Sequence, residues 1–206
     1  MSAIVTRWWW VRHAPIDAPS GTIAGRLDLP ADLTDTGAVA AMAARLPFEA
    51  LWLTTPLRRC RDTARALMDA KGEGLPLQVV PELTEQDFGR WQGRTHADLS
   101  AEEPEAVAAF WQAPATATPP EGESFAGLVT RTAAAVEALT GRHCGRDIVM
   151  VGHAGPIRAA LGHALGLPPE RMLALSVDCL HLTRLDHIAG EGPGTWRLTA
   201  ANIPPR

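Results

Sequence analysis

The sequence has no tyrosine, only three cysteines and no surplus of positive charge. Its 19 basic side chains are outnumbered by 23 acidic ones, so no overall positive field would hold a nucleic-acid backbone or an anionic membrane. The cysteines are scattered and form no Cys-x-x-Cys pair, which favours a reducing compartment over a disulfide framework. These absences predict a protein with neither nucleic-acid nor membrane partners.

Long hydrophobic runs are also missing. The most apolar stretch near the start, residues 8–11, lies between Arg7 and Arg12 and is far too short for a signal-peptide core or a membrane span. We therefore expect a cytoplasmic protein. The spacing typical of zinc ligands is absent from five histidines, which are His96, His143, His163, His181 and His187.

Length and composition favour one globular domain. The chain has 206 residues, of which 46% are hydrophobic and 20% charged, close to the average for soluble domains. Helical material at residues 97–111 is followed by a connector rich in Pro, Thr and Ala, and strand patterns resume beyond it. We interpret residues 1–206 as a single domain with a helical and loop insertion at about residues 94–123.

Strand and helix patterns alternate along the chain. Short apolar runs predict strands at residues 4–11, 50–54, 75–80, 147–151, 173–177, 180–185 and 195–199. Apolar spacings of three and four predict the intervening helices, with Asp35 and Ser124 as caps and Pro56 at a first helical position. This order is typical of a three-layer α/β/α sandwich with a mostly parallel central sheet and an antiparallel edge.

Seven tryptophans stand out, three of them consecutive at residues 8–10. A base-stacking platform is one interpretation, but a central strand is buried on both faces and the chain has no basic surplus. We therefore expect these indoles to pack in the core. Cys60, on the apolar face of its predicted helix, is expected to be a small core residue as well.

Two of the predicted parallel strands end in histidine. His13 follows the first strand and His153 follows the strand at residues 147–151, so side chains 140 residues apart would meet at one edge of the sheet. Helix N-termini at that edge aim unpaired N–H groups outward and favour anions. Each histidine alone is equally compatible with a structural role, but their matched placement indicates a shared site.

A cluster of arginines opens the helix after the second predicted strand. Arg58, Arg59 and Arg61 lie in its first turns with only Asp62 to offset them. Cations are unfavourable at a helix N-terminus unless an anion is bound nearby, so the cluster indicates a phosphate site. A solvated basic face remains the alternative for Arg58 and Arg61, and we expect Arg59 to reach inward.

Four motifs occur in a distinctive order. The first is Arg12-His13-Ala14, and the second is Thr-Pro-Leu-Arg-Arg at residues 55–59 with Thr-Ala at 63–64. The third, Leu-x-Glu-x-x-Phe-Gly-x-Trp-x-Gly, spans residues 83–93, and the fourth, Val-Gly-His-Ala-Gly-Pro-Ile-Arg-Ala, spans 151–159. Together they resemble the histidine phosphatase, or phosphoglycerate-mutase-like, superfamily. The resemblance implies the phosphoglycerate-mutase-like fold and a phosphoryl-transfer reaction.

The resemblance also implies a role for each matched residue. His13 would attack the phosphoryl group and form a phosphohistidine, a reaction that needs neither metal nor cofactor. Arg12, Arg59 and His153 would clamp the phosphoryl oxygens and stabilise their charge. Glu85 would protonate the leaving group, and a neighbouring phosphate dianion favours the protonated acid that this requires.

Some positions leave alternatives open. Glu82 and Asp87 are rival carboxylates, and only the motif selects Glu85. Many relatives continue the first motif as His-Gly-Glu-Thr with a nearby Asn, which is absent after His13 here. We expect Arg26 or backbone groups to replace that Asn, and we include Arg26 and Ala154 in the phosphate-binding set. Trp91 is expected at the pocket mouth.

The resemblance predicts a metal-independent phosphomonoester hydrolase acting on a small phosphorylated metabolite. The acid loop, residues 81–89, is most similar to that of the α-ribazole-5'-phosphate phosphatases of cobalamin synthesis. Two alternatives remain, a phosphoglycerate mutase-type phosphotransferase and a non-catalytic phosphate-binding regulatory module. The expected partner is a small phosphate ester, and homodimer formation is left open.

Overall fold

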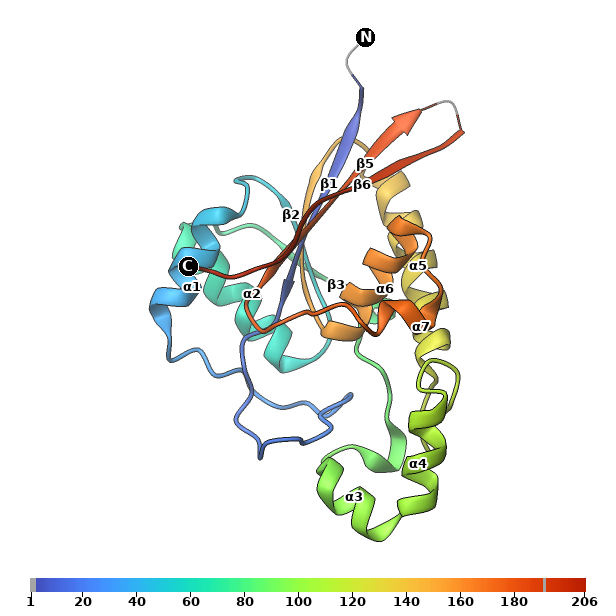
Figure 1. Ribbon diagram of the computed structural model, residues 1–206. Coiled ribbons are helices and arrows are strands. Elements are labelled where there is room, and N and C mark those ends of the chain that lie inside the picture. The colour runs from blue at the N-terminus through green and yellow to red at the C-terminus, as the bar shows by residue number, and fades with distance from the viewer. Residues whose placement is uncertain (1–2, 191) are drawn as a thin grey trace.

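The strand β1, Val5–Arg12, lies at the centre of a mixed sheet (Figure 1). In the computed structural model, which describes residues 3–190 and 192–206, the strand order is β3-β2-β4-β1-β5-β6. The other strands are β2 Leu51–Thr54, β3 Leu77–Val79, β4 Asp147–Gly152, β5 Leu182–Gly190 and β6 Gly192–Ile203. β3, β2, β4 and β1 run parallel, whereas β5 and β6 form an antiparallel edge. The predicted α/β sandwich is confirmed.

The three tryptophans of β1 are part of the core packing. Trp8 and Trp10 are fully buried on one face, with ring centroids 5.1 Å apart and nearly parallel planes, and Trp8 Nε1 donates to Thr140 Oγ1 at 2.9 Å. Trp9 points to the opposite face and donates to Asp147 Oδ1 at 2.8 Å. The expectation that these indoles pack in the protein rather than stack on bases is therefore confirmed.

Helices α1, Thr36–Arg45, and α2, Arg58–Lys71, cover one face of the sheet (Figure 1). Asp35 caps α1, as predicted, by accepting the backbone N–H of Ala38 at 2.9 Å. α2 begins two residues after the predicted start at Pro56. Cys60 is fully buried on its sheet-facing side, which confirms its prediction as a core residue.

The opposite face is covered by α5, Phe125–Arg142, and α6, Ala154–Leu165, followed by the short α7, Pro169–Met172. Ser124 caps α5 as predicted. The predicted strand at residues 173–177 is wrong, because these residues form turns and irregular chain after α7. The apolar side chains of this segment instead pack onto the helical layer.

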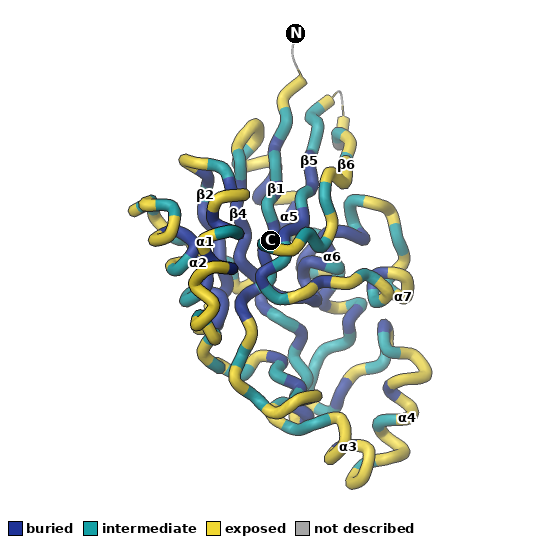
Figure 2. The backbone as a smooth tube through the Cα atoms, turned by 60° about the vertical axis from the view of Figure 1, so that its left-hand side comes forward, coloured by how far each residue is buried: buried dark blue, intermediate teal, exposed yellow. Residues whose placement is uncertain are grey.

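Residues 94–123, predicted to be a helical and loop insertion, contain two helices, α3, His96–Glu102, and α4, Pro104–Gln112. These helices lie beyond the C-terminal end of β1 (Figure 1). Most of their residues are exposed, whereas most residues of the central strands are buried (Figure 2). A small separate cluster of buried side chains joins them to the loop before α1, namely Ile23, Trp91, Leu99 and Phe110.

Trp91 is not at a pocket mouth, contrary to its prediction. It is 3% exposed inside this small cluster, and its Nε1 donates to Glu103 Oε2 at 3.3 Å. It is the last residue of the second of two short 3₁₀ turns, Pro81–Leu83 and Gly89–Trp91, which bound the acid loop. Trp91 therefore anchors the insertion to that loop. Within the described residues, no helix is both long and apolar enough to cross a bilayer.

Candidate active site

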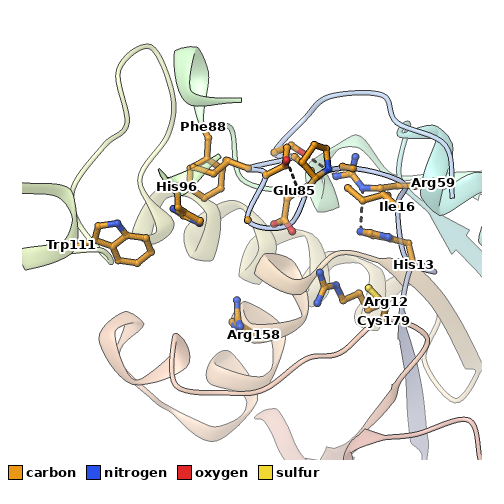
Figure 3. A pocket seen from close by; sticks show the side chains of 17 residues that line it. Arg12, His13, Ile16, Arg59, Glu85, Phe88, His96, Trp111, Arg158 and Cys179 are labelled. Atoms are coloured by element: carbon orange, nitrogen blue, oxygen red, sulfur yellow. Dashed lines mark hydrogen bonds between the residues drawn. The ribbon is translucent and has the colours of Figure 1, made fainter. Parts of the chain in front are cut away.

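A cavity of about 430 Å³ opens at the C-terminal end of β1 (Figure 3). Its inner wall carries Arg12, His13, Arg59 and Glu85, four of the residues singled out in the sequence. Arg12 is in register with Gly152 on the neighbouring β4, so the two histidines that follow these strands are also neighbours. Their ring centroids are 5.3 Å apart. Residues from four distant motifs therefore converge on one place, as expected for a parallel sheet.

His13 is held as a neutral imidazole with one defined tautomer. Its Nδ1 lies 2.7 Å from the carbonyl oxygen of Ala14, which can only accept, so Nδ1 carries the proton. The lone pair is then on Nε2, which accepts from Arg59 Nε at 3.1 Å. Burial, followed by the nearby Arg59 guanidinium, lowers the pKa of His13 to about 3. Nε2 of His13 is therefore unprotonated at neutral pH.

Arg59 is the arginine of its cluster that reaches inward. It is only 1% exposed, whereas Arg58 is exposed and pairs with Asp62 one helical turn later. The terminal nitrogens of Arg59 donate to the carbonyl oxygens of Leu27 at 2.6 Å and Gly25 at 2.7 Å. All three guanidinium nitrogens of Arg59 therefore donate hydrogen bonds, and the bond from Nε occupies the lone pair on Nε2 of His13.

His153 follows β4 and lies next to His13, but it is fully buried and is not among the residues that line the cavity. Arg59 Nη2 donates to its Nδ1 at 3.3 Å, so its proton is on Nε2, which lies 3.0 Å from Thr55 Oγ1. Burial lowers the pKa of His153 well below its usual value, and the neighbouring His13 and Arg59 act in the same direction. Without an anion, both histidines are therefore neutral.

Thr55 and Thr63 have positioning contacts that the sequence did not reveal. Both belong to the second motif, but pattern alone assigned them no role. Thr55 accepts the ring proton of His153, as described above. Thr63 Oγ1 accepts the backbone N–H of Ala14 at 3.0 Å and donates to the carbonyl of Arg59 at 2.7 Å. Thr63 therefore joins the loop that begins at His13 to the helix that carries Arg59.

Arg12 points into the cavity from the last position of β1 (Figure 3). Its Nη1 donates to the carbonyl of Val177 at 2.7 Å, which fixes the direction of the side chain. Its Nε is buried and has no hydrogen-bond partner among the described residues. Such an unpaired donor near His13 is what an anion-binding site needs before its ligand arrives.

Glu85 is the carboxylate of its loop that faces the cavity. Its Oε1 accepts the backbone N–H of Gly155 at 3.2 Å and that of Gln86 at 3.0 Å. Gly155 lies in the first turn of α6, where a negative charge is favourable. The rival Glu82 is exposed away from this cavity, and Asp87 instead accepts the N–H of Gly89 at 2.8 Å.

The backbone of Glu85 is held by a charged cluster outside the cavity. Arg26 Nε and Arg131 Nη2 each donate to the Glu85 carbonyl at 3.1 Å. Glu123 Oε1 bridges these arginines, at 2.9 Å from Arg26 and 2.6 Å from Arg131. Although burial opposes it, the hydrogen bond from Arg131 lowers the pKa of Glu123. The sequence motifs alone assign no role to Glu123 or Arg131.

Arg26 and Ala154 lie differently from the other members of the expected phosphate-binding set. Arg26 does not line the cavity, and its nitrogens bond to Glu85, Glu123 and, at 3.5 Å, Asp87. Ala154 is the first residue of α6 and lines an adjoining compartment of about 340 Å³. That compartment is mainly apolar and meets the first cavity at Glu85, Phe88, Trp111 and Arg158.

The similarity to a known family covers nearly the whole chain. Residues 8–203 match the sequence model of the histidine phosphatase superfamily (branch 1), and the chain belongs to this family. It is 30% identical to the adenosylcobalamin/alpha-ribazole phosphatase of Salmonella typhimurium, over 84% of this chain and 86% of that protein. It is 35% identical to the glucosyl-3-phosphoglycerate phosphatase of Mycolicibacterium vanbaalenii, over 81% of this chain and 77% of that protein.

A solved structure shows the same architecture. The native structure of a mycobacterial glucosyl-3-phosphoglycerate phosphatase superposes with a TM-score of 0.82 and 30% identity, covering 97% of this chain and 99% of that one. The resemblance inferred from four short motifs is therefore confirmed at the level of sequence and of fold.

Proposed function

We propose that this protein is a metal-independent phosphatase that hydrolyses a small phosphate monoester through a phosphohistidine on His13. The observation that carries the proposal is the state of His13, a buried neutral imidazole whose Nε2 lone pair faces the cavity residue Arg59. A neutral ring nitrogen is a nucleophile, whereas an imidazolium is not. Membership of a phosphatase family supports the same reaction.

Substrate binding must first uncover the nucleophile. Arg59 Nε caps the lone pair of His13 while its terminal nitrogens bond to two backbone carbonyls. A phosphoryl dianion is a stronger acceptor for a guanidinium than a neutral carbonyl is. We infer that the ester draws Arg59 onto its oxygens and frees Nε2. Arg12, which already has an unpaired buried Nε, would bind the same group.

The transfer then proceeds in two balanced steps. In the first, the bond between His13 Nε2 and phosphorus forms as the bond to the leaving oxygen breaks, and Glu85 gives its proton to that oxygen. In the second, water attacks the phosphohistidine, the nitrogen–phosphorus bond breaks, and Glu85 takes a proton from the water. A bound dianion favours the protonated ring of His153, which would then donate to the phosphoryl oxygens.

The roles of the remaining candidates follow from their contacts. Arg26 is proposed to position the acid loop, because its nitrogens bond to Glu85 and Glu123. Ala154 is proposed to offer its backbone N–H to the phosphate, because it opens α6 directly after His153. Residues 1–206 are proposed to act as a single cytoplasmic domain, without nucleic-acid or membrane partners. Homodimer formation stays an open prediction.

The proposed substrate is a small phosphorylated metabolite. Relatives are named for activity on alpha-ribazole and on glucosyl-3-phosphoglycerate, and we keep α-ribazole 5'-phosphate as a candidate. Phosphate release would be measured in excess EDTA from α-ribazole 5'-phosphate, phosphoglycerates, sugar phosphates and p-nitrophenyl phosphate. Wild type should release phosphate and His13→Ala should not. Activity that EDTA abolishes, or that survives in His13→Ala, would overturn the proposal.

A further inference from the structure

Arg158 is a cation of the cavity that the proposed mechanism does not use. It lies on α6, one turn after Gly155, and it lines both the cavity of His13 and the adjoining compartment. Its Nε donates to the carbonyl of Leu175 at 2.8 Å, which holds the guanidinium in place. Its two terminal nitrogens have no hydrogen-bond or ion-pair partner among the described residues. The N–H groups of these two nitrogens are therefore free to donate to a ligand in the cavity.

The surroundings of Arg158 make an unpaired charge costly. The side chain is half-buried, and burial lowers the pKa of Arg158 from its usual value while the charge of Glu85 opposes that shift. Glu85 itself makes no ion pair with Arg158, because its carboxylate is held by two backbone N–H groups. A partly desolvated guanidinium with two unpaired terminal nitrogens gains most from a carboxylate that accepts a hydrogen bond from each of them.

The position of Arg158 relates it to the leaving group rather than to the phosphoryl group. Glu85 marks where the leaving oxygen lies, and both Glu85 and Arg158 line the junction of the two compartments. In Figure 3, Arg158 points into the space between Trp111 and Arg12, facing Glu85. The alcohol part of an ester would therefore pass Arg158 before it meets the aromatic walls, which are Phe88, Phe110, Trp111 and Phe125.

We propose that Arg158 determines specificity by binding a carboxylate on the alcohol part of the substrate. Phosphate esters of hydroxy acids are then preferred over α-ribazole 5'-phosphate, which has no carboxylate. The inference rests on the proposed function. Arg158 is the only cation lining the adjoining compartment within the described residues, so it matches the single charge of a carboxylate. The aromatic walls would hold the apolar faces of whatever the hydroxy acid carries.

The test uses two esters that differ in one group. 3-Phosphoglycerate carries a carboxylate where glycerol 3-phosphate carries a hydroxymethyl group. Wild type should show a kcat/KM at least about tenfold higher for 3-phosphoglycerate, mainly through KM. Arg158→Gln should abolish this preference while leaving glycerol 3-phosphate within about twofold, and Arg158→Lys should restore part of it through its charge. Arg65→Gln, at an exposed position on α2, is the matched control.

p-Nitrophenyl phosphate separates the two proposals. If wild type hydrolyses it but does not prefer 3-phosphoglycerate, the carboxylate site is overturned and the proposed function stands. If Arg158→Gln slows all three esters equally, Arg158 acts on the phosphoryl group or on folding, and the inference fails again. If wild type hydrolyses none of the esters, the proposed function is wrong, and this inference, which rests on it, is wrong as well.

Discussion

The carboxylate of Glu85 accepts the backbone N–H of Gly155 at 3.2 Å, although the two residues are 70 positions apart in the chain. This bond places the proposed acid on the first turn of α6, next to His153, which caps that helix. The proposed proton donor and the phosphoryl clamp are thus held by one helix terminus. Their relative position depends on a close approach that only a residue without a side chain permits.

Gly155→Ala should impair proton donation. A Cβ at this position would overlap Glu85 Oε1 and press on the side chain of Leu128. We expect kcat for alkyl phosphates to fall at least about tenfold, and p-nitrophenyl phosphate to be slowed less because its leaving group needs little protonation. Glu85→Gln should show the same dependence on leaving group.

The matched control for this substitution is Gly141→Ala. Gly141 is exposed in α5 and has open space around its Cβ position, so kinetics should be unchanged. Equal slowing of all esters by Gly155→Ala would mean that the substitution disturbs the site generally and that its contact with Glu85 is not the cause.

Glu123→Gln should loosen the acid loop. Glu123 joins Arg26 and Arg131, and both arginines bond to the carbonyl of Glu85. Removing the charge weakens two partly buried ion pairs, so we expect about a tenfold lower kcat for alkyl esters with little change in the inhibition constant of phosphate. Glu121→Gln, at an exposed neighbouring pair, should have no effect. A higher phosphate inhibition constant with normal kcat would instead place Glu123 in phosphate binding.

Arg59→Ala should weaken binding of phosphate and vanadate. A buried guanidinium that bonds to an anion contributes roughly 1.5–3 kcal/mol, so inhibition constants should rise about 10- to 100-fold. Arg58→Ala is the control because Arg58 is exposed one residue away. Thermal melting identifies variants that fail to fold. Unchanged inhibition in a folded Arg59→Ala protein would remove Arg59 from the anion site.

Acid should destabilise the protein partly through His13. Its pKa falls from 6.5 to about 3 in the folded state, so the unfolded chain binds more protons between these values. Stability is therefore lost as pH falls through 6.5, by about 2 kcal/mol for this group between pH 7.5 and pH 5.0. Denaturant unfolding of wild type and His13→Asn at both pH values measures the difference. An equal pH dependence in the two proteins would show that His13 is not held neutral.

The order of strands and helices could be predicted because periodicity is local. The run 4–11 and the spacing within α2 depend on residues that are neighbours in sequence. The segment 173–177 has an equally good strand pattern, but its apolar side chains pack onto the helical layer, and this packing depends on contacts with residues far away in the sequence. That information is not local, so pattern alone could not supply it.

The site could be predicted where a side chain follows a strand or opens a helix. His13, His153 and Arg59 occupy such positions, and their convergence follows from parallel topology. The contacts of Arg26 could not be predicted in this way. Its long side chain can reach several partners that are distant in sequence, and it binds Glu123, which is 97 residues away. A Glu directly before the cap of α5, with Arg131 two turns later, was the only local sign of that cluster.

The central claim, that His13 forms a phosphohistidine, is tested most directly by trapping it. Wild type would be mixed with a fast ester such as p-nitrophenyl phosphate, quenched at alkaline pH to preserve phosphohistidine, and digested for mass spectrometry. The account predicts one added phosphoryl group on the peptide that contains His13, and none in His13→Ala. Turnover without that adduct, together with retained activity in His13→Ala, would contradict it.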